Sequence, residues 1–256
     1  DMYYKGEGVS KDYAKALEWY RKLAERGFSD DQYKLGNMYC KGEGVTQDFT
    51  KAVEWYRKSA EKGNAKAQLN LGEMYYYGRG VSKDYAKAVE WYRKSAEQGN
   101  IDAQRNLGEM YYNGKDYAKA VEWYQKSAER GNGSAQNHMG RMYEKGLGVS
   151  RDYAKAAEWY QKAISRGNTD AMCNLGYMYE YGLGVSKDNY RAAGLYFWAA
   201  KQGCLEAKKK WSSIHLIFKI KMFTKWFFLY FKNLYRYIRF ISSGKKKMKE
   251  PNTSPL

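Results

Sequence analysis

The sequence predicts an all-α solenoid of about six helical hairpins. Three observations support this fold class: a pattern that recurs every 36 residues, helical apolar periodicity within each unit, and prolines only at positions 251 and 255. The chain has 256 residues, which is enough for one or two globular domains or for one elongated array. Its apolar content of 44% excludes a disordered chain.

The repeat is clearest in the motif Lys-Ala-x-x-Trp-Tyr and in the glycine that follows it. Successive copies of that glycine are 36 residues apart, apart from one interval of 32 residues. The shorter interval results from the loss of four residues at positions 113–116, where most units carry a Gly-x-Gly-Val loop. A fixed period of this length is typical of repeat proteins, whose units bury their apolar faces by stacking.

Each unit is expected to contain two antiparallel helices joined by a short glycine-rich turn. In the third unit the first helix is predicted over residues 65–77 and the second over residues 84–98. Asp84 is a suitable N-cap for the second helix, and Gly99 is suited to end it in a left-handed conformation. Gly72 lies on the packing face of the first helix, where the lack of a Cβ lets the neighbouring helix approach closely.

The same signature residues occur in nearly every unit. In the third unit they are Leu71, Gly72, Tyr75, Gly78, Gly80, Val81, Asp84, Lys87, Ala88, Trp91, Tyr92, Lys94 and Gly99. This pattern resembles the Sel-one-like repeat, a relative of the tetratricopeptide repeat, over residues 1–203. The resemblance implies a right-handed superhelix of antiparallel helix pairs. It also implies an adaptor or scaffold that acts in bacterial signalling, host interaction or membrane-associated complexes.

The chain departs from the family pattern at three points. The first unit lacks most of its first helix, and Leu195 stands where the other units have tryptophan. Cysteine-rich members of the family carry paired cysteines in each repeat, whereas Cys40, Cys173 and Cys204 occupy three different repeat positions. We therefore do not expect a member of the disulfide-stapled subgroup.

No catalytic, metal or cofactor site is predicted, and no small-molecule substrate is expected. Ser59 and Lys62 match the Ser-x-x-Lys pattern of one class of hydrolases, but its companion motifs are absent from the sequence. His138 and His215 have no cysteine, aspartate or glutamate at metal-ligand spacing. A hydrolase, as some cysteine-rich relatives are assigned, is therefore the weaker alternative to a non-enzymatic protein.

The candidate binding residues are polar positions around the Leu-Gly step of each first helix. In tetratricopeptide-like arrays these helices line the concave face, where regularly spaced amides can hold an extended peptide. Alternatively, the same amides tie one hairpin to the next. The predicted residues are Gln68, Asn70, Glu73, Gln104, Asn106, Glu109, Gln136, His138, Arg141, Asn174 and Tyr177.

Most of the positive charge lies outside the repeats. Residues 204–256 hold 13 basic and 2 acidic residues, which accounts for +11 of the formal net charge of +17. We expect a capping or appended amphipathic basic aromatic helix over residues 204–242 and a disordered basic tail over residues 243–256. Such a helix fits the surface of an anionic membrane better than a transmembrane span. The membrane-surface candidates are Lys221, Lys225, Trp226, Lys232, Arg236 and Arg239.

The basic segment leaves other interpretations open. It could cap the array, contact a partner protein, or be degenerate sequence, whereas nucleic acid is not expected because no groove-reading motif accompanies the charge. No secretory signal is visible, but the chain starts with Asp1 inside a repeat, which predicts that the native N-terminus is missing. We expect a cytoplasmic or peripheral membrane location.

Overall fold

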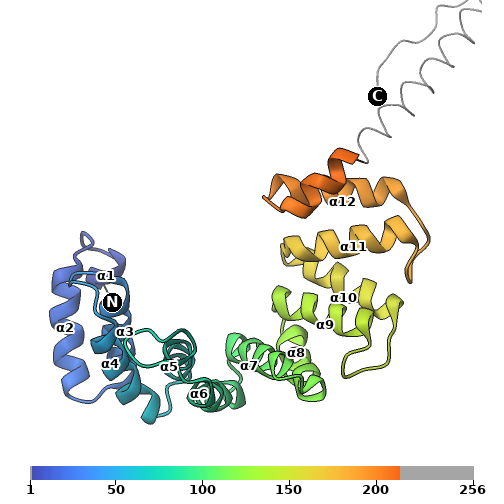
Figure 1. Ribbon diagram of the computed structural model, residues 1–256. Coiled ribbons are helices and arrows are strands. Elements are labelled where there is room, and N and C mark those ends of the chain that lie inside the picture. The colour runs from blue at the N-terminus through green and yellow to red at the C-terminus, as the bar shows by residue number, and fades with distance from the viewer. Residues whose placement is uncertain (1, 214–256) are drawn as a thin grey trace, which may run out of the picture.

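The computed structural model describes residues 2–213, and the chain forms an arch of stacked helical hairpins over this range (Figure 1). No strand occurs among the described residues. The helices are α1 (Met2–Lys5), α2 (Tyr13–Glu25), α3 (Ser29–Lys41), α4 (Phe49–Glu61), α5 (Ala65–Tyr77), α6 (Tyr85–Glu97), α7 (Ile101–Asn113), α8 (Tyr117–Glu129), α9 (Gly133–Lys145), α10 (Tyr153–Ser165), α11 (Thr169–Tyr181) and α12 (Asn189–Lys201). A further helical segment covers residues 205–213.

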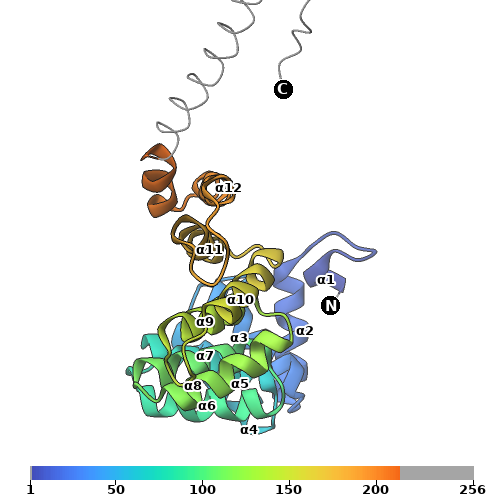
Figure 2. The same ribbon diagram turned by 90° about the vertical axis from the view of Figure 1, so that its right-hand side faces the viewer.

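Consecutive helices pair to form six repeats, from α1 and α2 in the first to α11 and α12 in the sixth. Each helix packs mainly against the helices before and after it in the chain. Figure 2 shows the last helices standing above the others, as expected where each hairpin is rotated relative to the previous one. The predicted all-α, right-handed superhelical solenoid is therefore confirmed. Of the helix predicted over 204–242, the structure describes only residues 205–213.

The caps of the helices follow from single polar residues. Asp84 accepts a hydrogen bond from the backbone nitrogen of Lys87 at 3.0 Å, as the sequence predicted for the second helices. The first helices have asparagine caps that the sequence analysis did not identify. Asn64, for example, accepts a hydrogen bond from the backbone nitrogen of Ala67 at 2.9 Å. An aspartate or asparagine side chain thus caps α2 and each helix from α4 to α12, whereas α3 follows Phe28 and has no side-chain cap.

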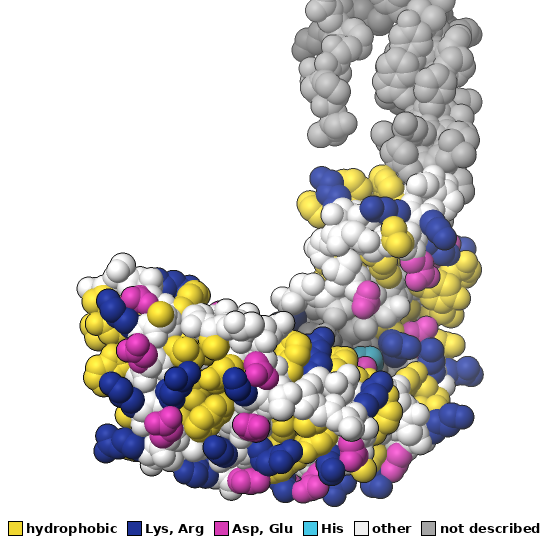
Figure 3. All heavy atoms as spheres, turned by 60° about the vertical axis from the view of Figure 1, so that its left-hand side comes forward, with side chains coloured by type: hydrophobic (Ala, Val, Ile, Leu, Met, Phe, Trp, Pro, Cys, Tyr) yellow, Lys and Arg dark blue, Asp and Glu magenta, His cyan; other side chains and the backbone are white. Residues whose placement is uncertain are grey.

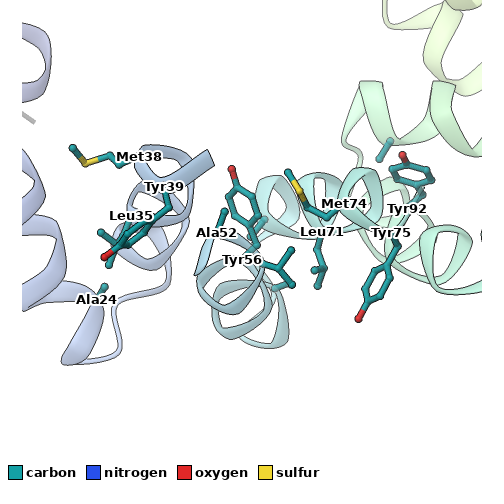
Figure 4. Packing of buried hydrophobic residues seen from close by; sticks show 14 of the residues in the cluster. Ala24, Leu35, Met38, Tyr39, Ala52, Tyr56, Leu71, Met74, Tyr75 and Tyr92 are labelled. Atoms are coloured by element: carbon teal, nitrogen blue, oxygen red, sulfur yellow. The ribbon is translucent and has the colours of Figure 1, made fainter. Parts of the chain in front are cut away.

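A glycine and a tyrosine determine how closely the two helices of a repeat approach. A Cβ added to Gly72 would lie 2.6 Å from Cδ1 of Tyr92, a side chain that is almost fully buried. The same pairing occurs between Gly36 and Tyr56, and Figure 4 shows Tyr56 and Tyr92 among the residues of the core. The predicted close approach at Gly72 is confirmed. The tyrosine ring of the second helix occupies the space that a Cβ would need.

The Gly-x-Gly-Val loops join the two helices of a repeat and contact the preceding repeat. Gly80 has a φ of +69°, and a Cβ there would clash with the backbone at Phe49, where the second helix of the preceding repeat begins. The fourth repeat lacks this loop, and Tyr85, at the equivalent position of the third repeat, is 51% exposed. The loops are therefore structural turns that cover the start of the preceding second helix.

Candidate partner-binding face

The candidate residues lie on first helices, which face the hollow of the arch in its N-terminal half. Figure 1 shows α3 and α5 on the inner side, with α2, α4 and α6 on the outer side. In Figure 3 the molecule is hollowed between its two ends, and side chains of both charge signs surround the hollow. The positions around the Leu-Gly step differ from one another in what they contact.

The glutamines three residues before the Leu-Gly or Met-Gly step are structural ties. Nε2 of Gln68 donates a hydrogen bond to the carbonyl oxygen of Ala60 at 3.0 Å, so it joins α5 to the second helix of the preceding repeat. Gln104 and Gln136 make the equivalent bonds, at 3.1 and 3.0 Å. All three side chains are buried. The sequence pattern predicted these glutamines as binding residues, but they are buried and therefore not accessible to a partner.

The asparagines before the leucine connect successive first helices. Nδ2 of Asn70 donates to Oδ1 of Asn37 at 3.1 Å, and Nδ2 of Asn174 donates to Oδ1 of Asn137 at 3.0 Å. Asn70 and Asn174 are half-buried, whereas Asn106 is buried. Asn70 and Asn174 therefore contribute to the ties between repeats and still reach the inner surface.

A small cavity of about 60 Å³ lies between α5, α6 and α7. It contains Glu73 and Glu109, which the sequence predicted, together with neighbours that it did not. Nη1 of Arg105 lies 3.3 Å from Oε2 of Glu109, so the one guanidinium in the lining is engaged by one of the two carboxylates. The lining residues are Glu73, Tyr76, Tyr77, Tyr92, Arg105, Asn106, Glu109 and Met110.

The environment of Glu73 disfavours its negative charge. Its pKa is raised above the ordinary value of 4.5, because burial penalises the charged carboxylate more than Arg105 and a hydrogen bond with Asn106 stabilise it. A carboxylate in this state gains more from a bound cation than an exposed one does, because the cation supplies compensation that solvent no longer provides.

The predicted residues of the fifth and sixth repeats lie in a different environment. The ring of His138 stacks on Tyr124 with centroids 4.6 Å apart. Burial lowers the pKa of His138 to about 4, with nearby Arg141 acting in the same direction, so the imidazole is neutral at pH 7. Tyr177 packs against Tyr181, with centroids 4.5 Å apart. These side chains thus pack against aromatic rings, whereas Glu73 and Glu109 line a cavity.

Tyr76, Tyr77 and Arg105 were missed by the sequence analysis. The two tyrosines lie at the end of α5, one helical turn beyond the Leu-Gly step, and their rings are 4.8 Å apart. A search extended to the last turn of each first helix would have found both, because the third repeat ends that helix with three tyrosines. Arg105 follows Gln104 directly, and no arginine recurs at the equivalent position of the other repeats.

Some predictions concern residues that the structure does not describe. The membrane-surface candidates from Lys221 to Arg239 lie outside residues 2–213, as does His215. Within the described range, no group of three or more metal-ligating side chains comes together, and no helix is long and apolar enough to cross a membrane.

The structure defines the class as an α-solenoid of helical hairpins. The family model of the Sel1 repeat matches residues 1–28, 29–64, 65–100, 101–132, 133–168 and 169–204, and the chain therefore belongs to the Sel1 repeat family. Repeats of this kind commonly mediate contacts between proteins. A comparison with curated proteins finds no match.

Solved structures give the same assignment. The chain is 41% identical to c5321, a protective antigen of uropathogenic Escherichia coli strains that displays an SLR fold, with a TM-score of 0.79 over 83% of this chain and 46% of that one. It thus spans about half the length of that antigen. A Sel1 repeat protein from Oxalobacter formigenes is 38% identical, with a TM-score of 0.72 over 78% of this chain and 84% of that one. YrrB, a TPR protein described as having an unusual peptide-binding site, shares the fold at 18% identity and a TM-score of 0.52, over 76% of this chain and 98% of YrrB.

Proposed function

We propose that the chain is a non-enzymatic scaffold that holds an extended segment of a partner protein along the inner face of the arch. The observation that carries this proposal is the polar cavity between α5, α6 and α7, which two glutamates and one arginine line and in which the arginine pairs with Glu109. The repeats around it are tied together by buried amides, so the cavity is held by a preorganised framework, which lowers the entropic cost of binding.

The chemistry of the cavity favours a basic side chain of the partner. Glu73 and Glu109 carry two potential negative charges against the one positive charge of Arg105. Tyr76 and Tyr77 also line the cavity, and aromatic faces attract ammonium and guanidinium groups. A lysine or arginine side chain would therefore place its aliphatic stem against the rings and its charge beside Glu73.

The asparagines along the inner face would hold the backbone of the same segment. An amide side chain offers two donor hydrogens and two acceptor lone pairs, and the bond from Asn70 to Asn37 uses one donor of Asn70. Contacts to a peptide backbone do not depend on its sequence. Selectivity would then come from the basic side chain in the cavity. The amides would extend the contact along the peptide backbone.

Selection from a random 12-residue peptide library against the full chain tests the proposal. We expect the selected peptides to be enriched in lysine or arginine and to lose binding to the variant Glu73→Gln/Glu109→Gln. The matched control is Glu90→Gln, because Glu90 pairs with Lys94 at 2.7 Å on an exposed second helix. Selected peptides without basic residues, or equal binding to wild type and the double variant, would reject the cavity as the binding site.

The basic segment after the repeats supports a second proposal, a contact with an anionic membrane surface. Its support is compositional: residues 204–256 carry 13 basic and 2 acidic residues, and eleven aromatic residues lie between positions 211 and 242. Each basic residue near an anionic bilayer contributes roughly 1 kcal/mol. Aromatic side chains favour the interface between headgroups and acyl chains.

Sedimentation of the full chain with phosphatidylglycerol vesicles tests this second proposal. The variant Lys225→Glu/Lys232→Glu should reduce the bound fraction strongly. The control Lys66→Glu/Lys145→Glu makes the same change of net charge on exposed lysines of the repeats and should reduce it less. Equal losses for both variants would show that net charge alone, and not this segment, determines binding.

A further inference from the structure

Two cysteine side chains meet at the C-terminal end of the array. Cys173 lies in α11, and Cys204 directly precedes the helical segment over residues 205–213. Their Sγ atoms are 2.9 Å apart although the residues are separated by 31 positions in the chain. Both side chains are half-buried, and both are free thiols in this structure. The two sulfurs are therefore in contact, and a disulfide requires them to approach further, to about 2.0 Å.

Cys204 stands where four of the preceding repeat junctions have a capping asparagine. The equivalent positions Asn64, Asn100, Asn132 and Asn168 each cap the following first helix with a side-chain oxygen. A thiol is a weak hydrogen-bond acceptor and a poor substitute for that oxygen. The junction between the sixth repeat and the next helical segment has thus lost an amide cap and gained a pair of thiols.

We propose that Cys173 and Cys204 are a redox-active pair that closes to an intramolecular disulfide when the oxidant is a low-molecular-weight disulfide such as oxidised glutathione. The geometry carries this inference, because the two thiols come from different helical elements and already lie side by side. The third cysteine, Cys40, is in α3 of the second repeat, far along the array from this pair (Figure 1).

The reaction proceeds by two exchange steps. The thiolate of Cys204 attacks one sulfur of oxidised glutathione, which forms a mixed disulfide and releases one glutathione thiolate. Cys173 then gives up its proton and attacks the sulfur of Cys204, which forms the Cys173–Cys204 bond and releases the second glutathione. The protein loses two protons and two electrons, the two glutathione thiolates take up the protons, and the oxidant leaves as two molecules of reduced glutathione.

The environment of Cys173 suits it to the second step. Burial raises the pKa of this thiol, and its hydrogen bond with Cys204 acts in the same direction, so Cys173 stays protonated at neutral pH. A protonated thiol is a poor first nucleophile. It can still resolve a mixed disulfide that is held against it, because the two sulfurs are already in contact.

Closure would fix the helical segment over residues 205–213 to α11. Other contacts already hold this segment: Nζ of Lys210 lies 3.0 Å from Oε2 of Glu180, and the rings of Trp211 and Phe197 are 5.1 Å apart. The disulfide would add a covalent bond between α11 and the start of this segment, which lie before and after α12 in the chain. It would thereby hold residues 205–213 on the array under oxidising conditions.

Thiol counting on the full chain in glutathione buffers tests the proposal. Oxidised glutathione should remove two of the three thiols, without a persistent glutathione adduct, and peptide mapping should find Cys173 joined to Cys204. The melting temperature of the oxidised chain should rise by roughly 5–10 °C and return to the initial value on reduction.

Serine variants make the outcome specific. Cys40→Ser should close as the wild type does, whereas Cys173→Ser should keep a stable glutathione adduct on Cys204 because the resolving thiol is gone. The proposal would be overturned if the wild type kept all three thiols, kept a stable adduct on Cys204, or formed its disulfide through Cys40.

Discussion

The fourth repeat differs from the fifth and sixth in the hydrogen bonding of the tyrosine hydroxyl that lies beneath the first helix. In the later repeats the hydroxyls of Tyr160 and Tyr196 donate to Glu144 and Glu180. In the fourth repeat the hydroxyl of Tyr124 is buried without a hydrogen-bond partner. The later repeats therefore use glutamates internally, and the earlier ones leave glutamates at the open cavity. The comparison shows how one repeat pattern can place its glutamates either in hydrogen bonds with a core tyrosine or at a cavity.

The largest expected effect concerns His138, which lies where the two regions meet. Its folded pKa of about 4 is below the ordinary value of 6.5, so the unfolded chain binds a proton more readily between these pH values. The stability from this group is fully present above pH 6.5 and is lost as pH falls toward 4, by as much as about 3 kcal/mol. Asparagine occupies this position in the third, fourth and sixth repeats, so His138→Asn is the matched variant.

Urea titrations at several pH values test this prediction. The difference in free energy of unfolding between wild type and His138→Asn should change across this pH range, with the variant relatively more stable at the acid end. A constant difference would show that His138 titrates normally in the folded chain.

The next effect concerns the glycine that lets the two helices of the third repeat approach. Gly72→Ala should destabilise the chain by about 2 kcal/mol, because its new methyl group would overlap the ring of Tyr92. Gly194 in α12 has no atom within 4 Å of an added Cβ, so Gly194→Ala should be neutral or stabilising by up to about 1 kcal/mol. Thermal melts of both variants make the comparison, and equal losses would contradict the steric explanation.

The smallest effect on stability comes from the tyrosine hydroxyls. Tyr160→Phe removes the donor to Glu144 and should cost about 1 kcal/mol. Tyr124→Phe removes a buried hydroxyl that has no partner and should cost nothing or stabilise the chain. Chemical denaturation of the two variants measures the difference directly. The opposite order would mean that the two regions do not differ in the way described above.

The sequence predicted most of the framework because each unit repeats the same capping, packing and turn residues. The bounds of α5, the cap at Asp84 and the close approach at Gly72 all depend on residues that act on near neighbours. For Gln68 the sequence left two roles open, contact with a partner or a tie between hairpins, because the backbone carbonyl of Ala60 that it bonds leaves no mark on the side-chain pattern. The cavity depends on three helices meeting, and only part of its lining follows the repeat.

The binding constant of a lysine-containing peptide, taken from the library selection, tests the central claim most directly. Kd should rise at least about 10-fold for Glu73→Gln/Glu109→Gln, which corresponds to about 1.4 kcal/mol. It should stay within about 2-fold of wild type for Glu144→Gln/Glu180→Gln, which changes the same number of charges in the closed repeats. Equal losses for the two double variants, or a loss only for the second, would contradict the assignment of the binding face to the third and fourth repeats.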